Sequence, residues 1–136
     1  MSFRTLPNYL AALVVLIGVS HSIVLFRHLQ FTHPWVDIPL HLAGGLWIGL
    51  FSLWLYYSDR TRFPEKDRSL HFVVTVALVS SMTIGAAWEL FEYVVNLLTV
   101  GEFYDLVDML ADLTNDAIGA LSGAAFFVKR GYNREQ

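Results

Sequence analysis

Charged residues are missing from three long stretches of the chain. No Asp, Glu, Lys or Arg occurs in residues 5–26, 38–58 or 69–88. Each stretch has about the length, roughly 20 residues, that an α-helix needs to cross a bilayer. We therefore expect a transmembrane helix over each stretch, and we expect the third helix to continue past Glu89 and Glu92.

A fourth apolar stretch, residues 117–128, is too short to cross a bilayer alone. Aspartates precede it, and a helix that begins near Asp105 would be about 36 Å long by the end of the stretch, which is sufficient. Lys and Arg favour this crossing because basic residues collect on the cytoplasmic side. With four crossings, all but Arg27 of the nine lie on one side: Arg4, Arg60, Arg62, Lys66, Arg68, Lys129, Arg130 and Arg134.

The expected fold is therefore all-α, a four-helix transmembrane bundle with both termini cytoplasmic. Its helices are expected at about 6–26, 38–58, 69–98 and 105–129, within a single integral membrane domain over residues 1–136. Short connections make neighbouring helices antiparallel.

Composition agrees with a membrane location. Hydrophobic residues make up 55% of the chain and charged residues 15%, against about 25% charged residues in ordinary soluble domains. The mean hydropathy is +0.49. These values exclude a disordered chain and a nucleic-acid-binding protein with a basic face, and membrane lipid is the expected surrounding. The chain has no Cys, which excludes disulfides, thiolate metal ligands and Cys nucleophiles.

The acidic residues concentrate in the half of the bundle opposite to the basic residues. Most of them lie there: Asp37, Glu89, Glu92, Glu102, Asp105, Asp108, Asp112 and Asp116. Uncompensated negative charges in or near a membrane require bound cations, protons, a basic partner or water. The sequence thus predicts a polar site in the outer half of the membrane.

Helical spacing brings these residues onto shared faces. Asp108, Asp112 and Asp116 follow one another at four-residue intervals and form one stripe. Glu89 and Glu92 share a face, and so do Asp37 and His41. Intramembrane ionisable residues usually point into the bundle or into a wet cavity. We therefore expect one pocket, open outward, that contains Asp112, Asp116, Glu89, Glu92 and His41.

Simpler interpretations exist for the same residues. Asp37 with Pro39 could only begin a helix, and His41 could only hydrogen-bond a backbone carbonyl. The three aspartates could form a solvated amphipathic segment that lies on the outer surface.

Carboxylates with imidazole and no sulfur suit divalent Mg²⁺, Ca²⁺, Mn²⁺, Fe²⁺ or Zn²⁺. The candidate metal ligands are Asp112, Asp116, Glu89, His41, Asp108 and Asp37, and Glu92 is the candidate general base. A metal site of this kind can activate water against an ester or phosphoester, so a metal-dependent enzyme acting on lipid or lipid-linked substrate is the first hypothesis. A proton or cation pathway and an accessory subunit of a larger membrane complex remain alternatives.

Two pairs of glycines have the small-xxx-small spacing that lets membrane helices approach closely. They are Gly45 with Gly49 and Gly119 with Gly123. The spacing is equally compatible with packing inside the chain and with a homo-oligomer or a larger membrane complex formed through these faces.

Three short motifs resemble one known family. They are Asp37-x-x-x-His41-x-x-Gly44-Gly45, Trp88-Glu89-x-x-Glu92, and Asp108-x-x-x-Asp112-x-x-x-Asp116-x-x-Gly119-Ala120. Their order is similar to that in the YjdF-like family of small bacterial inner-membrane proteins and, more distantly, in the VanZ-like proteins linked to glycopeptide resistance. Met109 follows Asp108 where the family commonly has Thr. The resemblance implies a multi-pass protein of a bacterial or archaeal cytoplasmic membrane with acidic residues inside the membrane, and it supplies no activity.

Overall fold

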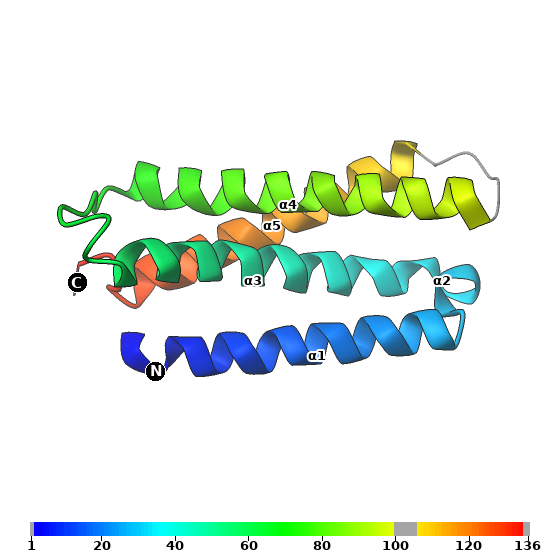
Figure 1. Ribbon diagram of the computed structural model, residues 1–136, viewed down its shortest axis with the longest axis horizontal. Helices are drawn as coiled ribbons and strands as arrows, with labels where there is room; N and C mark the ends of the chain where they lie inside the picture. Colours follow the sequence, from blue (N-terminus) through cyan, green and yellow to red (C-terminus); the bar gives the residue numbers. More distant parts are fainter. Residues whose placement is uncertain (1, 100–105, 135–136) are drawn as a thin grey trace.

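The computed structural model describes residues 2–99 and 106–134, which form helices joined by turns and loops. Its four long helices are α1 (Leu6–Phe26), α3 (Asp37–Ser58), α4 (Leu70–Thr99) and α5 (Leu106–Lys129). Shorter elements are η1 (Phe3–Thr5), α2 (Leu29–Thr32) and η2 (Pro34–Val36). The long helices lie side by side in one bundle (Figure 1). The expected all-α four-helix fold is confirmed, whereas Glu102 and Asp105 lie outside the described residues.

Three of the described helices are long and apolar enough to cross a membrane. They are Phe3–Phe26, Asp37–Ser58 and Leu70–Thr99. The helix α5 is not among these three, because Asp108, Asp112 and Asp116 interrupt its apolar sequence. It nevertheless packs along α3 and α4 within the bundle.

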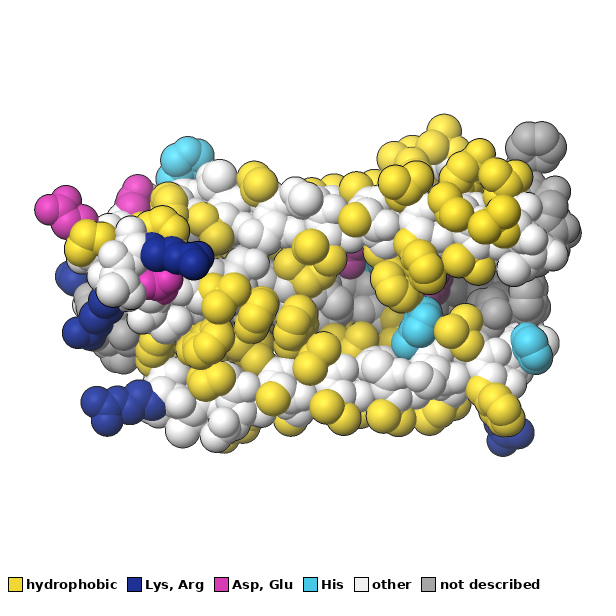
Figure 2. All heavy atoms as spheres, in the orientation of Figure 1, with side chains coloured by type: hydrophobic (Ala, Val, Ile, Leu, Met, Phe, Trp, Pro, Cys, Tyr) yellow, Lys and Arg dark blue, Asp and Glu magenta, His cyan; other side chains and the backbone are white. Residues whose placement is uncertain are grey.

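Both termini lie at the same end of the bundle, together with the loop between α3 and α4 (Figure 1). Most of the Lys and Arg side chains in view gather at this end in Figure 2. We call it the basic end. The short helix α2 lies at the opposite end, which we call the acidic end because Asp37, Glu92 and Asp108 lie in the helix segments nearest to it.

Aromatic packing closes the basic end. Phe127 contacts Phe3, Tyr57 and Tyr132 with ring centroids 6.2, 5.2 and 5.4 Å apart. The Tyr57 hydroxyl donates a hydrogen bond of 2.5 Å to the Asp67 carbonyl. These side chains belong to the hydrophobic core, so this end of the bundle is filled.

The loop after α3 also ends that helix through polar contacts. The Lys66 ammonium donates hydrogen bonds to the Tyr56 and Asp59 carbonyls, which would otherwise lack partners at a helix C-terminus. The backbone N–H groups of Arg62 and Thr61 donate to the Asp59 carboxylate at 2.9 and 3.0 Å. These hydrogen bonds lower the pKa of the Asp59 carboxyl.

The helices α3 and α5 touch backbone to backbone along a line that we call the glycine seam. A Cβ atom on Gly45 would lie 2.0 Å from the Asp116 carbonyl oxygen, and one on Gly119 would lie 2.2 Å from the Leu42 carbonyl oxygen. Gly49 and Gly123 face Ala120 and Leu46 in the same way, at 3.2 and 3.1 Å. Both glycine pairs are therefore used for packing inside the chain.

By contrast, α1 packs mainly against α3, and its fully buried residues lie only near the basic end. Its buried residues are Leu6 and Leu10, and the Trp47 indole N–H donates a hydrogen bond of 2.8 Å to the Leu10 carbonyl. Farther along α1, Val15 is 63% exposed. The rest of the helix stands against the bundle less closely, and this leaves a cavity beside the acidic residues.

Candidate metal centre

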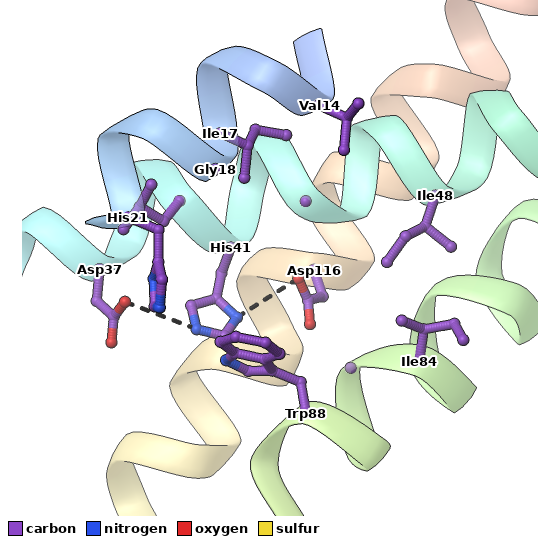
Figure 3. A pocket seen from close by; sticks show the side chains of 13 residues that line it. Val14, Ile17, Gly18, His21, Asp37, His41, Ile48, Ile84, Trp88 and Asp116 are labelled. Atoms are coloured by element: carbon purple, nitrogen blue, oxygen red, sulfur yellow. Dashed lines mark ion pairs between the residues drawn. The ribbon is translucent and has the colours of Figure 1, made fainter. Parts of the chain in front are cut away.

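His41, on the second turn of α3, is the centre of a cluster of acidic residues. Its Nε2 atom lies 3.8 Å from an Asp37 carboxylate oxygen, 3.9 Å from one of Asp112 and 4.0 Å from one of Glu89. Its Nδ1 atom lies 3.5 Å from an Asp116 oxygen. Figure 3 shows the ring between Asp37 and Asp116. Three helices thus supply carboxylates to one imidazole.

Each helix contributes through the spacing of its residues. Asp37 is the first residue of α3, and one turn of helix separates it from His41 on the same face. Asp112 and Asp116 are one turn apart on the face that α5 presents to α3 and α4. Glu89 lies on the buried side of α4. Since α3 and α5 run parallel to each other and α4 runs antiparallel to both, all of these positions lie at one level of the bundle (Figure 1).

The cluster is almost completely shielded from solvent. The exposed fractions are 8% for His41, 2% for Glu89, 4% for Asp112 and 3% for Asp116, whereas the Asp37 side chain is 33% exposed. Burying a charge costs several kcal/mol unless it is compensated. One imidazolium can compensate only one of four carboxylates. The arrangement therefore requires protons or a bound cation.

Asp116 is held from several sides. Its carbonyl oxygen accepts a hydrogen bond of 3.3 Å from the buried Ser81 hydroxyl, and Gly45 lets its backbone approach α3. A Cβ atom on Gly85 would lie 2.3 Å from its Oδ2 atom, so this glycine provides the space for the carboxylate. Sequence reasoning missed Ser81 and Gly85 as parts of the site. Gly85 lies one turn before Glu89, and this spacing of a small residue from an acidic one is the signal that could have identified it.

Two other candidate residues lie farther from the imidazole. Glu92 is half-buried and lies one turn after Trp88 on α4. It is not among the described carboxylates within 4.0 Å of His41. Asp108 is exposed one turn before Asp112. The structure therefore brings together Asp37, His41, Glu89, Asp112 and Asp116, with Glu92 beside them and Asp108 outside.

A cavity of about 290 Å³ adjoins the cluster between α1, α3 and α4. His41, Asp37 and Asp116 line its polar part, with His21 and Trp88 beside them. The rings of His21 and Trp88 meet edge to face at 5.3 Å. The sequence predicts one pocket that is open outward. In Figure 2 a hollow lies on the flank of the bundle, between the rows of side chains that belong to α1 and α4.

The donor atoms fit a divalent cation in type and in spacing. One ligand atom each of Asp37, His41 and Asp112 lies within 4.8 Å of the other two. Ligands at about 2.1 Å from Zn²⁺ in a tetrahedral site lie about 3.4 Å apart, and the longer bonds to Ca²⁺ spread ligands farther. The separations of 3.8–4.0 Å around His41 Nε2 are close to such an arrangement. Small side-chain movements would close the ligands around an ion.

Comparison with known families gives one match over nearly the whole chain. A family described as a predicted membrane protein (DUF2238) matches residues 1–132. No curated protein and no solved structure matches the chain. The family agrees with the membrane location and carries no statement about chemistry.

Proposed function

The chain belongs to the DUF2238 family of predicted membrane proteins, and we propose that it binds a divalent cation at the His41 cluster. We further propose that it uses the cation to act on a lipid or lipid-linked substrate. One observation carries the proposal: four carboxylates from three helices lie within 4.0 Å of a single buried imidazole. Such a concentration of negative charge is stable inside a membrane protein only with compensating positive charge.

The two ring nitrogens of His41 support different roles for the surrounding carboxylates. The Nε2 atom, together with Asp37, Asp112 and Glu89, would hold the cation. The Nδ1 atom faces Asp116, and a metal-binding histidine commonly donates its other N–H to a carboxylate. Asp116, which the sequence suggests as a ligand, is therefore proposed as the residue that orients the ring. Imidazole with carboxylates suits Zn²⁺, Mn²⁺ or Fe²⁺ better than Mg²⁺ or Ca²⁺, which prefer oxygen ligands alone.

A cation bound here would act as a Lewis acid on an ester or phosphoester and lower the pKa of bound water. Glu92 is the proposed general base. It lies on the same side of α4 as Glu89, one turn after Trp88, which lines the cavity. Asp108, exposed one turn from Asp112, is a weaker candidate ligand than the five clustered residues.

For the membrane orientation we propose that the basic end faces the cytoplasm and that α5 is the fourth crossing. Lys and Arg at that end and the position of both termini there support this orientation (Figure 2). We also propose that this membrane is a bacterial or archaeal cytoplasmic membrane. The relationship to YjdF-like and VanZ-like proteins is part of the same proposal. Since the glycine seam is buried inside the chain, an oligomer or larger complex would require another surface.

A proton or cation pathway receives less support from the interior of the bundle. Between the cluster and the basic end, the buried side chains include Leu53, Val73, Ala77 and Ala124. Among the described residues of the helices, Ser81, which adjoins Asp116, is the last buried polar side chain in that direction before the Tyr57 hydroxyl at the basic end. Ions crossing the membrane need polar groups along their path.

Metal content of the detergent-purified protein tests the proposal. We expect about one Zn²⁺ or Mn²⁺ per chain by mass spectrometry, and loss of nearly all of it in His41→Ala and Asp112→Asn because each removes a ligand. Asp116→Asn should still bind the ion at saturation, with an affinity about 10–100-fold lower, because it only orients the ring.

Glu65→Gln, an exposed acidic residue at the basic end, is the matched control and should keep the metal. Circular dichroism and gel filtration verify that each variant is folded. Wild-type protein that contains no metal after incubation with Zn²⁺ and Mn²⁺ would overturn the proposal.

A further inference from the structure

The cavity beside His41 has two chemically different parts. Val14 and Ile17 of α1, Ile48 of α3 and Ile84 of α4 line its apolar part. His41, Asp37 and Asp116 line the other part. Figure 3 shows the apolar side chains on either side of the space, with His41 and Asp116 between them and Asp37 nearby. A ligand that fits both parts has a hydrocarbon segment and a polar group.

The position of this cavity in the bundle favours entry from the bilayer. Two of its walls, α1 and α4, belong to helices that are long and apolar enough to cross a membrane. The hollow lies on the flank of the bundle in Figure 2, rather than at its end. In the proposed membrane orientation the flank of the bundle faces lipid chains, since the hydrocarbon core extends over about 30 Å.

Gly18 extends the space along α1. A Cβ atom on this residue would have no neighbour within 4 Å, although Gly18 lines the cavity. It also lines a shallow groove on α1 with Val15, Val19 and Ile23. The missing side chain therefore joins the cavity to the lipid-facing surface of α1. A flexible hydrocarbon chain can follow this path, whereas a bulky rigid group cannot.

We propose that this cavity receives the hydrocarbon chain of an amphiphile from the bilayer, through the space between α1 and α4, and holds its phosphate head group beside His41. The hydrocarbon site is carried by the shape and lining of the cavity alone. The choice of phosphate rests on the proposed function, because the buried carboxylates would repel an anion unless a divalent cation lay between them.

Photolabelling tests this inference on the full chain in phosphatidylcholine vesicles. The probe is a long-chain alkyl phosphate with a diazirine in its chain, and labelled residues are located by mass spectrometry. We expect labels on Val14, Ile17 or Ile84. In Gly18→Leu the new side chain occupies open space, so the protein should fold normally while cavity labelling falls by about tenfold because the chain no longer fits.

Ala12→Leu is the matched control, since Ala12 is exposed on α1 and does not line the cavity. It should label like the wild type. Equal labelling of Gly18→Leu and Ala12→Leu, or labels confined to the opposite exposed face of α1, would overturn the inference.

Metal analysis of the same samples separates this inference from the proposed function. Gly18→Leu should keep its metal while it loses the label, which supports both. If the wild type contains no metal but still labels in a Gly18-dependent way, the proposed catalytic function fails and the hydrocarbon site stands. An alkyl alcohol with the same diazirine should label the cavity with or without a chelator, whereas labelling by the phosphate probe should fall when the chelator removes the cation.

Discussion

The glycine seam between α3 and α5 and the cavity between α1 and α4 use the same residue type in opposite ways. In the seam, a Cβ atom on Gly45 would lie 2.0 Å from a backbone oxygen. Beside the cavity, a Cβ atom on Gly18 would meet nothing within 4 Å. In the seam, glycine brings two helices together, and at the cavity it keeps a space open. What faces a glycine, rather than the glycine itself, decides which effect it has.

The glycine seam and the cavity also have different roles in the candidate site. The seam fixes the backbone of α5 against α3, so that Asp112 and Asp116 are held beside His41. The cavity lets a molecule reach the same imidazole from the flank (Figure 3). A site with precisely placed ligands needs a rigid support, and a site that admits a lipid needs an open wall. In this bundle the seam is the rigid support and the cavity is the open wall.

The largest expected effect is the difference in stability between two variants, each of which adds one methyl group to one of the two regions. Gly45→Ala places a Cβ atom against the backbone of α5, which cannot move independently. We expect a loss of about 3 kcal/mol in the free energy of unfolding, as for overpacked cores. Gly18→Ala should change this free energy by less than about 1 kcal/mol, because the methyl group has space and alanine favours helix. Denaturation in detergent with increasing dodecyl sulfate, followed by circular dichroism, measures both.

Gly119→Ala is the second variant of the seam, since its Cβ atom would lie 2.2 Å from the Leu42 carbonyl oxygen. It should resemble Gly45→Ala although it lies on the other helix. Similar stabilities for the Gly45 and Gly18 variants would mean that the seam and the cavity do not differ as described.

The sequence identifies the glycine pairs of the seam and most of the cluster, but it leaves open what the glycines pack against, and it does not indicate the apolar lining of the cavity. The apolar stretches, the four-residue spacing of Asp112 and Asp116, and the glycine pairs are all local patterns. They predict which faces are buried. The expected meeting of Asp112, Asp116, Glu89, Glu92 and His41 followed from antiparallel helices at one depth, and the structure places Glu92 farther from the imidazole than the other three carboxylates.

The remaining features depend on how the helices are rotated and how far apart they stand. No spacing within α3 indicates that Asp116 faces Nδ1 while Asp112 faces Nε2. The space that Gly85 leaves for the Asp116 carboxylate involves two helices. The cavity depends on the limited packing of α1, which is equally apolar where it is buried and where it is exposed. Such relations between helices are decided by tertiary packing and are absent from any single segment.

Gly85→Ala should have a smaller effect than the seam variants. Gly85 lies where the cavity meets Asp116, so this variant tests how the two regions are connected. Gly85 lines the cavity, but its Cβ atom would lie 2.3 Å from the Asp116 Oδ2 atom. A carboxylate can rotate away, so the free energy of unfolding should fall little. The ring of His41 would lose its orienting contact, and we expect about tenfold weaker metal binding, as for other residues that orient a ligand. Titration with Zn²⁺ measures the affinity.

Gly18→Ala is the matched control, because it adds the same methyl group to the same cavity in open space. Its metal affinity should equal that of the wild type. If both variants weaken metal binding equally, the space beside Asp116 has no special role in the site.

The smallest expected effect on stability concerns the hydrogen bond between Trp47 of α3 and Leu10 of α1, which limits how far α1 can move from α3. The Trp47 indole donates a hydrogen bond to the Leu10 carbonyl and stacks on Phe51 with ring centroids 4.8 Å apart. Trp47→Phe can keep the stacking but removes the hydrogen bond, which should cost about 1 kcal/mol. Trp35→Phe, which removes a 63% exposed indole, should cost less.

Because the lost contact holds α1 at the filled end, photolabelling of the cavity should rise in Trp47→Phe while metal binding is unchanged. Unchanged labelling together with the expected loss of stability would mean that α1 keeps its position without this hydrogen bond.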